Sequence, residues 1–195
     1  AVAMAKELGD CVGAFKVGLE LFTSTGPRIF DSLREAGADR IFFDGKFHDI
    51  PNTVAGAARA AVRTGVWMFN VHTQGGSAMM RAAVDAAGDE ASRLGVEVPL
   101  IIGVTVLTSI NQEILNHELS VPMTLDNQVT HLAQLAQNSG LDGVVSSPHE
   151  IVPVKSACEP KFLVVTPGVR PSWASANDQK RIMSPEEAVA HGADY

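Results

Sequence analysis

Charged and hydroxyl side chains gather behind one short apolar run. Residues 41–43 are Ile-Phe-Phe, and Asp44, Lys46, Asp49 and Thr53 follow within ten positions. Side chains two apart in a strand share a face, so Asp44 and Lys46 point the same way. An Asp-x-Lys pair alone would indicate no more than a salt-bridged strand end. Buried charge is costly unless paired, however, so this larger set indicates a functional site and not packing alone.

The elements that must position these residues alternate along the chain. Apolar runs predict strands, and amphipathic patterns predict the helices between them. The expected strands are 15–19, 41–47, 67–72, 99–107, 141–146 and 161–166, and the expected helices are 1–8, 27–36, 51–63, 77–94, 124–138, 148–157 and one from 184 to 192, with a helical or irregular insertion at 110–123. Apolar strands without period-two alternation are typical of a parallel sheet covered by helices, which is the α/β class.

The order of these elements favours a (β/α)8 TIM barrel. Six strands are complete, residues 193–195 would begin another, and the leading helix implies a strand before residue 1, which makes eight. We therefore expect a single TIM-barrel domain over residues 1–195 that lacks strand one and most of strand eight. A doubly wound open sheet is the alternative, but no Gly-x-Gly-x-x-Gly follows any strand.

Composition excludes several classes of partner. The 195 residues are 46% hydrophobic with a formal net charge of −7, which argues against nucleic acid and anionic membrane surfaces. No apolar run approaches the about 20 residues of a membrane span. Cys11 and Cys158 are too few for a disulfide framework and indicate reduced thiols in a cytoplasmic protein. The chain begins at Ala1 without Met, which is typical of a fragment.

In a TIM barrel the chemistry lies at the C-terminal ends of the strands. Lys16 lies inside the apolar run Ala-Phe-Lys-Val-Gly and either extends its ammonium to solvent or pairs with Asp44 on the adjacent strand. The other strand ends offer Asp44, Lys46, His72, Thr108, Ser109 and Arg170. Lys16, Asp44, Lys46 and Asp49 alternate in sign, so each charge can hold its neighbour ionised. His48 and His72 lack His-x-His or Glu-x-x-His spacing, so we expect structural roles and no metal.

The string Asp-Gly-Lys-Phe-His-Asp-Ile-Pro-Asn-Thr at residues 44–53 resembles the signature of the orotidine 5′-monophosphate decarboxylase family, bacterial type. The Leu-Thr-Ser turn at 107–109, Thr-Pro-Gly-Val-Arg at 166–170 and Asp-Gln-Lys-Arg at 178–181 match the same family. The resemblance implies a carboxy-lyase without a cofactor. It would make uridine 5′-monophosphate from orotidine 5′-monophosphate in de novo pyrimidine biosynthesis.

The resemblance also implies roles for individual residues. Lys46 would protonate C6 of the pyrimidine, Asp44 would face the substrate carboxylate, and Lys16 and Asp49 would complete the charged network. Asp49 and Thr53 would reach into the partner subunit's site, which implies a homodimer. The remaining substrate contacts would be Thr108 and Ser109 at the pyrimidine, Arg170 and Gln179 at the phosphate, and Pro167 and Gly168 in the segment that leads to Arg170. The alternative for the last segment is a solvated basic loop.

Two alternatives and one departure accompany the resemblance. Magnesium-dependent sugar-phosphate decarboxylases and synthases share Asp-x-Lys-x-x-Asp, although the Ile-Pro-Asn-Thr continuation at 50–53 favours the pyrimidine enzyme. The family's first-strand Asp and last-strand Gly-Arg have no counterpart in the 195 residues, so an inactive barrel fragment is the other alternative. Gly45 stands where the family usually has a large apolar residue. We expect it to face the helices, with enlarged helix side chains filling the gap.

Overall fold

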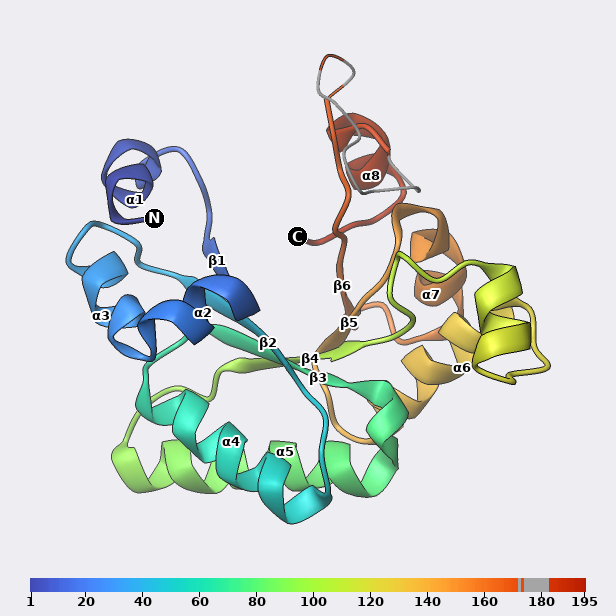
Figure 1. The fold of residues 1–195 in the computed structure, drawn as a ribbon, viewed down its shortest axis with the longest axis horizontal. Helices are drawn as coiled ribbons and strands as arrows, with labels where there is room; N and C mark the ends of the chain where they lie inside the picture. The colour runs from blue at the N-terminus through green and yellow to red at the C-terminus, as the bar shows by residue number, and fades with distance from the viewer. Residues whose placement is uncertain (172, 174–182) are drawn as a thin grey trace. The chain divides into compact units, whose positions relative to one another are not determined.

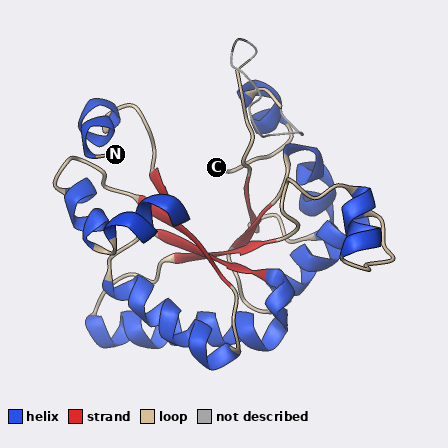
Figure 2. Cartoon of the chain, in the orientation of Figure 1, coloured by secondary structure: helices blue, strands red, loops and turns tan. Residues whose placement is uncertain are grey.

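The computed structural model describes residues 1–171, 173 and 183–195 and has an α/β fold with six parallel strands (Figures 1 and 2). The chain divides into two compact units. The first comprises Ala1–Val71 and Ala78–Ile101, and the second comprises His72–Ser77 and Ile102–Tyr195. Among the described residues, no helix combines the length and apolar character that crossing a membrane requires.

The first unit is built on three parallel strands in the order β1-β2-β3. Gly18 of β1 pairs in register with Asp44 of β2, and Phe43 of β2 pairs with Phe69 of β3. Its strands and helices are α1 (Val2–Leu8), β1 (Phe15–Gly18), α2 (Leu19–Thr25), α3 (Arg28–Arg34), β2 (Ile41–Phe47), α4 (Pro51–Arg63), β3 (Met68–His72) and α5 (Gly76–Leu94). The last residue of β3 and the first two residues of α5 are assigned to the second unit.

Aromatic rings form much of the core of this unit behind β2. Phe43 lies 4.5 Å from Phe22 of α2 and 5.2 Å from Phe30 of α3 between ring centroids, and 5.6 Å from Phe47. Phe43 and Phe47 project to the helix side of β2, as period-two alternation predicts. The opposite side of the same strand is therefore left to Asp44 and Lys46.

The second unit repeats the strand–helix alternation. Ile102 of β4 pairs in parallel with Gly143 of β5, and Gly143 pairs with Leu163 of β6. Its elements are η1 (Thr73–Gly75), β4 (Leu100–Val104, from Ile102 on), a π-helical turn η2 (Ile114–Glu118), α6 (Leu125–Asn138), β5 (Gly143–Val145), η3 (Pro148–Glu150), α7 (Ile151–Ala157), β6 (Leu163–Val165) and α8 (Pro185–Ala190). Helix α8 begins where Ser184 and Glu187 form a capping box, as its sequence predicts.

The predicted elements agree with this structure, most closely around the charged string. The expected strand 41–47 and helix 51–63 match β2 and α4 to the residue, and the other strands are shorter than expected by up to four residues. Helix α2 was not expected, because its Thr-Ser-Thr end has low helix propensity. Residues 193–195 form no strand, but Thr166 donates its main-chain N–H to the Tyr195 carbonyl at 2.8 Å, so this segment runs beside β6.

Candidate active site

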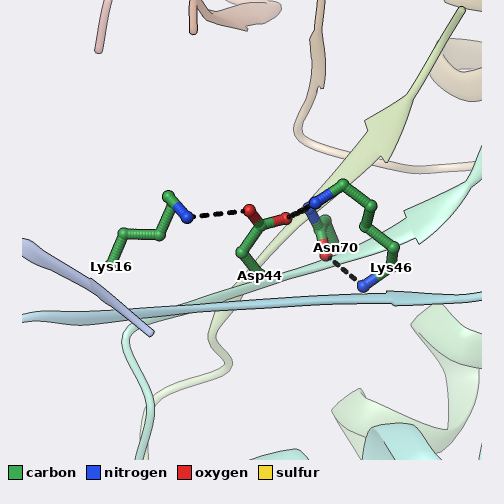
Figure 3. A network of polar contacts seen from close by, with 4 residues as sticks. All are labelled: Lys16, Asp44, Lys46 and Asn70. Atoms are coloured by element: carbon green, nitrogen blue, oxygen red, sulfur yellow. Dashed lines mark hydrogen bonds and ion pairs between the residues drawn. The ribbon is translucent and has the colours of Figure 1, made fainter. Parts of the chain in front are cut away.

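The carboxylate of Asp44 lies between two lysine ammonium groups (Figure 3). Lys16 Nζ donates to Asp44 Oδ2 at 3.0 Å, and Lys46 Nζ donates to Asp44 Oδ1 at 2.6 Å. The side chain of Asp44 is 13% exposed, whereas those of Lys16 and Lys46 are 54% and 29% exposed. The cluster therefore has a shielded acid and two cations that remain accessible to a ligand.

Three adjacent strands of the first unit supply this cluster. Lys16 is on β1, Asp44 and Lys46 are on β2, and Asn70 is on β3. The pairing predicted between Lys16 and Asp44 is present because the two parallel strands place Gly18 opposite Asp44, two residues beyond Lys16. A long lysine side chain spans that offset. The site thus lies toward the C-terminal ends of the strands, where the sequence predicts chemistry.

Strand β2 is irregular at the charged residues. Phe43 pairs with Phe69 and Phe47 pairs with Val71, so four steps along β2 match two steps along β3. Inside this bulge Lys46 has a φ of 49°, which is uncommon for a residue with a side chain and costs on the order of 1–2 kcal/mol. Bulges next to functional sites re-aim side chains, and this one directs Lys46 back onto Asp44.

Opposing effects act on the pKa of Asp44. Burial raises it, but hydrogen bonds from Lys46, Asn70 and Lys16 outweigh the burial and hold the pKa of Asp44 below its ordinary value. Asp44 is therefore a carboxylate at neutral pH. With two ammonium groups around one carboxylate, the cluster carries a net positive charge that favours an anionic ligand.

Asn70 completes the cluster and was not among the residues that the sequence singled out. Its Nδ2 donates to Asp44 Oδ1 at 2.7 Å, and its Oδ1 accepts from the main-chain N–H of Lys46 at 2.7 Å. A polar amide within the apolar strand Met-Phe-Asn-Val-His was the available signal, because buried amides need partners. The partners themselves could not be read from that signal.

The other predicted residues of the first unit do not join the cluster within the described chain. Asp49 is exposed, and its Oδ1 accepts the main-chain N–H of Ile50 at 2.7 Å. Thr53 is exposed in the first turn of α4, where its N–H donates to the Ile50 carbonyl. Both side chains face solvent, so three of the four alternating charges come together in one chain and the fourth does not.

Gly45 lies on the helix side of β2, as expected, but its surroundings differ from the expectation. A Cβ at this position would come within 2.9 Å of the Phe43 ring and 3.0 Å of the Phe47 ring. The space is thus filled by the neighbours at i−2 and i+2 on the same strand. The atoms nearest to a Cβ at this position therefore belong to strand side chains, where helix side chains were expected.

The second unit contains the remaining predicted substrate contacts. Thr108 is half-buried and Ser109 exposed in the turn after β4. After β6, Pro167 is half-buried and Gly168 is buried with a φ of 80°. The Arg170 main-chain N–H donates to the Met183 carbonyl at 2.9 Å, and its Nη1 donates to the Val169 carbonyl at 2.8 Å. Gln179 lies outside the described residues.

The described part of the chain offers no group of three or more His, Cys, Asp and Glu side chains that could hold a metal ion. His48, which the sequence places next to the charged string, is exposed, and His72 at the end of β3 is half-buried. The polar chemistry of this region is therefore that of lysine, carboxylate and amide groups, which can donate protons and stabilise charge.

The similarity to known proteins extends over the whole chain. An orotidine 5′-phosphate decarboxylase of Syntrophomonas wolfei is 50% identical over 196 residues, covering 100% of this chain and 82% of the relative. The enzyme of that name from Moorella thermoacetica is 51% identical, covering 98% of this chain and 76% of the relative. The crystal structure of orotidine 5′-phosphate decarboxylase from Lactobacillus acidophilus aligns with a TM-score of 0.79 at 37% identity, covering 91% of this chain and 74% of that one.

A second solved structure and a family model agree with these relatives. An uncharacterized conserved protein from Geobacillus kaustophilus aligns with a TM-score of 0.84 at 37% identity over 99% of this chain and 81% of that one. Residues 1–195 match the model described as orotidine 5′-phosphate decarboxylase / HUMPS family. Because the Asp-x-Lys string lies on β2 and relatives are about 50% identical over nearly the whole chain, the chain belongs to the orotidine 5′-phosphate decarboxylase / HUMPS family.

Proposed function

We propose that this chain is a carboxy-lyase that converts orotidine 5′-monophosphate to uridine 5′-monophosphate, without a cofactor, in pyrimidine biosynthesis. The observation that carries the proposal is the Lys46 ammonium 2.6 Å from the Asp44 carboxylate, in a chain that is 50% identical to a decarboxylase of that name. The ion pair holds this ammonium in place and the Lys46 side chain is 29% exposed, so the ammonium can both stabilise and protonate a reacting carbon.

The reaction requires a fixed cation and a proton. The bond from C6 to the carboxylate breaks, carbon dioxide leaves, and the electron pair stays on C6, where no carbonyl group is placed to delocalise it. The Lys46 ammonium stabilises this carbanion, then gives its proton to C6 and becomes neutral. Water returns a proton to the amine, so the balance is one proton consumed for each carbon dioxide released.

Asp44 has two proposed effects. It anchors Lys46 and Lys16, so that the ammonium groups need no rearrangement when the carbanion forms. It also faces the substrate carboxylate. Two carboxylates about 4 Å apart repel by about 4 kcal/mol at an effective dielectric of 20. Loss of carbon dioxide relieves this repulsion, although the preorganised charge around Lys46 is the larger contribution.

The remaining contacts are proposed from the family resemblance. Thr108 and Ser109 contact the pyrimidine, Arg170 and Gln179 hold the phosphate, and Pro167 and Gly168 contact the substrate in the segment that leads to Arg170. Binding energy from the phosphate, far from the reacting carbon, then helps to organise the reacting groups. Arg170 is half-buried, and its backbone is held by the hydrogen bond to the Met183 carbonyl, which is compatible with this role.

We further propose that β1–β6 are strands two to seven of a (β/α)8 barrel formed as one domain, and that two chains associate in the cytoplasm as a homodimer. The exposed positions of Asp49 and Thr53 support shared sites, because both side chains are available to a second subunit. Free thiols at Cys11 and Cys158 agree with a reducing compartment.

The activity is tested on the full-length protein with orotidine 5′-monophosphate, by following the absorbance change as uridine 5′-monophosphate forms. We expect turnover that is unchanged by a chelator. Loss of turnover on chelation and its return with magnesium would contradict the proposal and favour the sugar-phosphate enzymes that share Asp-x-Lys-x-x-Asp. A folded full-length protein that releases no carbon dioxide from this nucleotide would also overturn it.

The shared site is tested by mixing two inactive variants, Lys46→Ala and Asp49→Ala. A heterodimer would hold one intact site, so statistical mixing should restore roughly a quarter of the wild-type sites. The matched control mixes Lys46→Ala with Asp44→Asn, whose changes fall in the same half of the site and should restore nothing. Mixed dimers that form but remain inactive in the first pair would disprove the sharing.

A further inference from the structure

Asn70 is a polar side chain in the most buried part of β3. It is 1% exposed, and its neighbours Phe69 and Val71 are both 0% exposed. A primary amide in such surroundings is costly unless both of its ends are hydrogen-bonded. The Lys46 main-chain N–H can only donate and the Asp44 carboxylate can only accept, so the orientation of the amide follows from its partners.

The acceptor end of Asn70 holds the backbone of Lys46. In the bulge of β2 the N–H of Lys46 is bonded by a side chain, the Asn70 Oδ1 at 2.7 Å. Lys46 has a φ of 49° at this point, which is an uncommon conformation that surrounding contacts must maintain. The direction in which the Lys46 side chain leaves the strand therefore depends on this hydrogen bond.

The donor end of Asn70 holds the carboxylate of Asp44. Asp44 Oδ1 accepts from Asn70 Nδ2 at 2.7 Å and from Lys46 Nζ at 2.6 Å, while Oδ2 accepts from Lys16 at 3.0 Å. A neutral donor fixes the rotation of the carboxylate without changing the charge of the cluster. An acid at position 70 would cancel the net positive charge that favours an anionic substrate.

We propose that Asn70 is a positioning residue, which sets the direction of the Lys46 ammonium and the rotation of the Asp44 carboxylate through one amide. Its catalytic consequence rests on the proposed function, because the groups it positions are those that would meet C6 and the substrate carboxylate. Asn70 itself touches neither. A displacement of the proton donor by about 1 Å can lower turnover on the order of 100-fold.

The test uses Asn70→Ala and Asn70→Asp in the full-length protein, with kcat and KM for orotidine 5′-monophosphate. Asn70→Ala should lower kcat by roughly 10- to 100-fold and leave KM within about threefold, since the substrate contacts remain. Asn70→Asp keeps an acceptor for the Lys46 N–H but loses the donor to Asp44 and adds negative charge. It should lower kcat and also raise KM.

Glu90→Gln is the matched control, since Glu90 is 4% exposed and lies in the same unit. It should lower stability and leave kcat unchanged. All rates are measured at a temperature at which circular dichroism shows each variant to be folded. If Asn70→Ala does not fold, the isosteric Asn70→Asp decides the question. The proposal would be overturned if the folded Asn70 variants had the kcat of the wild type. It would also be overturned if their kcat fell no more than that of Glu90→Gln when the variants are equally stable.

A readout without substrate separates this proposal from the proposed function. In the ligand-free protein, carbon-13 NMR of the Asp44 carboxyl group should show a higher pKa in Asn70→Ala than in the wild type, with Lys16 and Lys46 still facing it. The amide nitrogen shift of Lys46 should also move. Both signals unchanged would overturn the positioning role. A wild-type protein that is inactive on the nucleotide but shows both changes would instead refute only the function.

Discussion

Two carboxylates in the first unit are each held between two cations, but the cations differ. Asp44 lies between Lys16 and Lys46, whereas Glu90 of α5 lies between Arg63 of α4 and Arg93. The closest contacts are equally short, with 2.6 Å from Lys46 to Asp44 and 2.6 Å from Arg63 to Glu90. In both clusters the acid is the shielded member, because the side chain of Asp44 is 13% exposed and that of Glu90 is 5% exposed.

The difference in chemistry follows from the cation type. A lysine ammonium is a compact charge that can release its proton when its surroundings favour the neutral form, whereas an arginine guanidinium remains protonated. The Arg93 guanidinium donates to both oxygens of Glu90, at 3.0 and 2.7 Å, which is a rigid geometry. The arrangement at Glu90 can therefore only connect two helices, whereas that at Asp44 can also transfer a proton.

The positions of the two clusters are consistent with this difference. Glu90 and its partners lie on helices α4 and α5, and Arg93 is at the regular i+3 spacing. The Asp44 cluster lies on three neighbouring strands and includes a bulge, a positive φ and a buried amide. Irregular backbone costs free energy and persists only where the surrounding structure maintains it. A charge cluster in regular helices connects elements, and one in irregular backbone is a candidate for function.

The largest expected effect comes from making the Asp44 cluster resemble the Glu90 cluster. Lys46→Arg keeps the positive charge but removes a cation that can release a proton at neutral pH. Removal of a general acid costs typically 10²- to 10⁴-fold in rate, and we expect kcat to fall within or beyond that range. The converse variant Arg93→Lys should keep wild-type turnover. Steady-state kinetics on both variants measure this, and substantial activity in Lys46→Arg would refute the proton-donor role.

The next effect sharpens the contrast between the two sides of β2. Gly45→Ala places a Cβ within 2.9 Å of the Phe43 ring and 3.0 Å of the Phe47 ring, so at least one ring must move. Overpacking of this kind costs about 1–3 kcal/mol of unfolding free energy. Urea denaturation should show the loss, with turnover at 25 °C little changed because the residue faces away from Asp44. If Gly45→Ala instead changed the pH dependence of turnover without changing stability, residue 45 would have to lie on the same side of β2 as Asp44, and the assignment would be wrong.

The smallest effect concerns the acid sensitivity of the Glu90 cluster. Hydrogen bonds from Arg93 and Arg63 lower the pKa of Glu90 from 4.5 to about 2. Both guanidinium side chains are more than half exposed, at 57% and 61%, so solvent weakens the ion pairs. A carboxyl group whose pKa is lower in the folded state stabilises the protein at pH values above its unfolded-state pKa. This stabilisation is lost as the pH falls through the folded-state pKa.

Glu90→Gln should therefore lower the urea midpoint by a constant amount above about pH 4.5 and by progressively less between pH 4.5 and 2. Urea titrations at pH 7, 4 and 2.5 measure the difference from wild type. Asp44→Asn provides the comparison, because the pKa of Asp44 is also below its ordinary value and the same direction applies. A Glu90→Gln difference that stays constant down to pH 2.5 would show that charge is not what stabilises this cluster.

Several features could be predicted from local sequence. The apolar run before Asp44 and the Pro51 start of the next helix determine β2 and α4, because each signal depends on residues adjacent in the chain. The ion pair between Lys16 and Asp44 was also predictable, since a lysine within an apolar strand needs a carboxylate nearby and parallel strands bring one into reach. The family resemblance added the expected roles of these residues.

What the sequence by itself determined was the alternation of strands and helices, the face shared by Asp44 and Lys46, and the position of Gly45 behind them. Only the tertiary structure decided that β2 bulges between Phe43 and Phe47, that Lys46 has a positive φ, and that Asn70 joins Asp44 to the Lys46 backbone. Periodicity describes a regular strand, and a bulge interrupts that regularity through bonds to another strand. The partners of Asn70 lie 24 and 26 positions away in the chain, so the register of β3 against β2 decides which groups it meets.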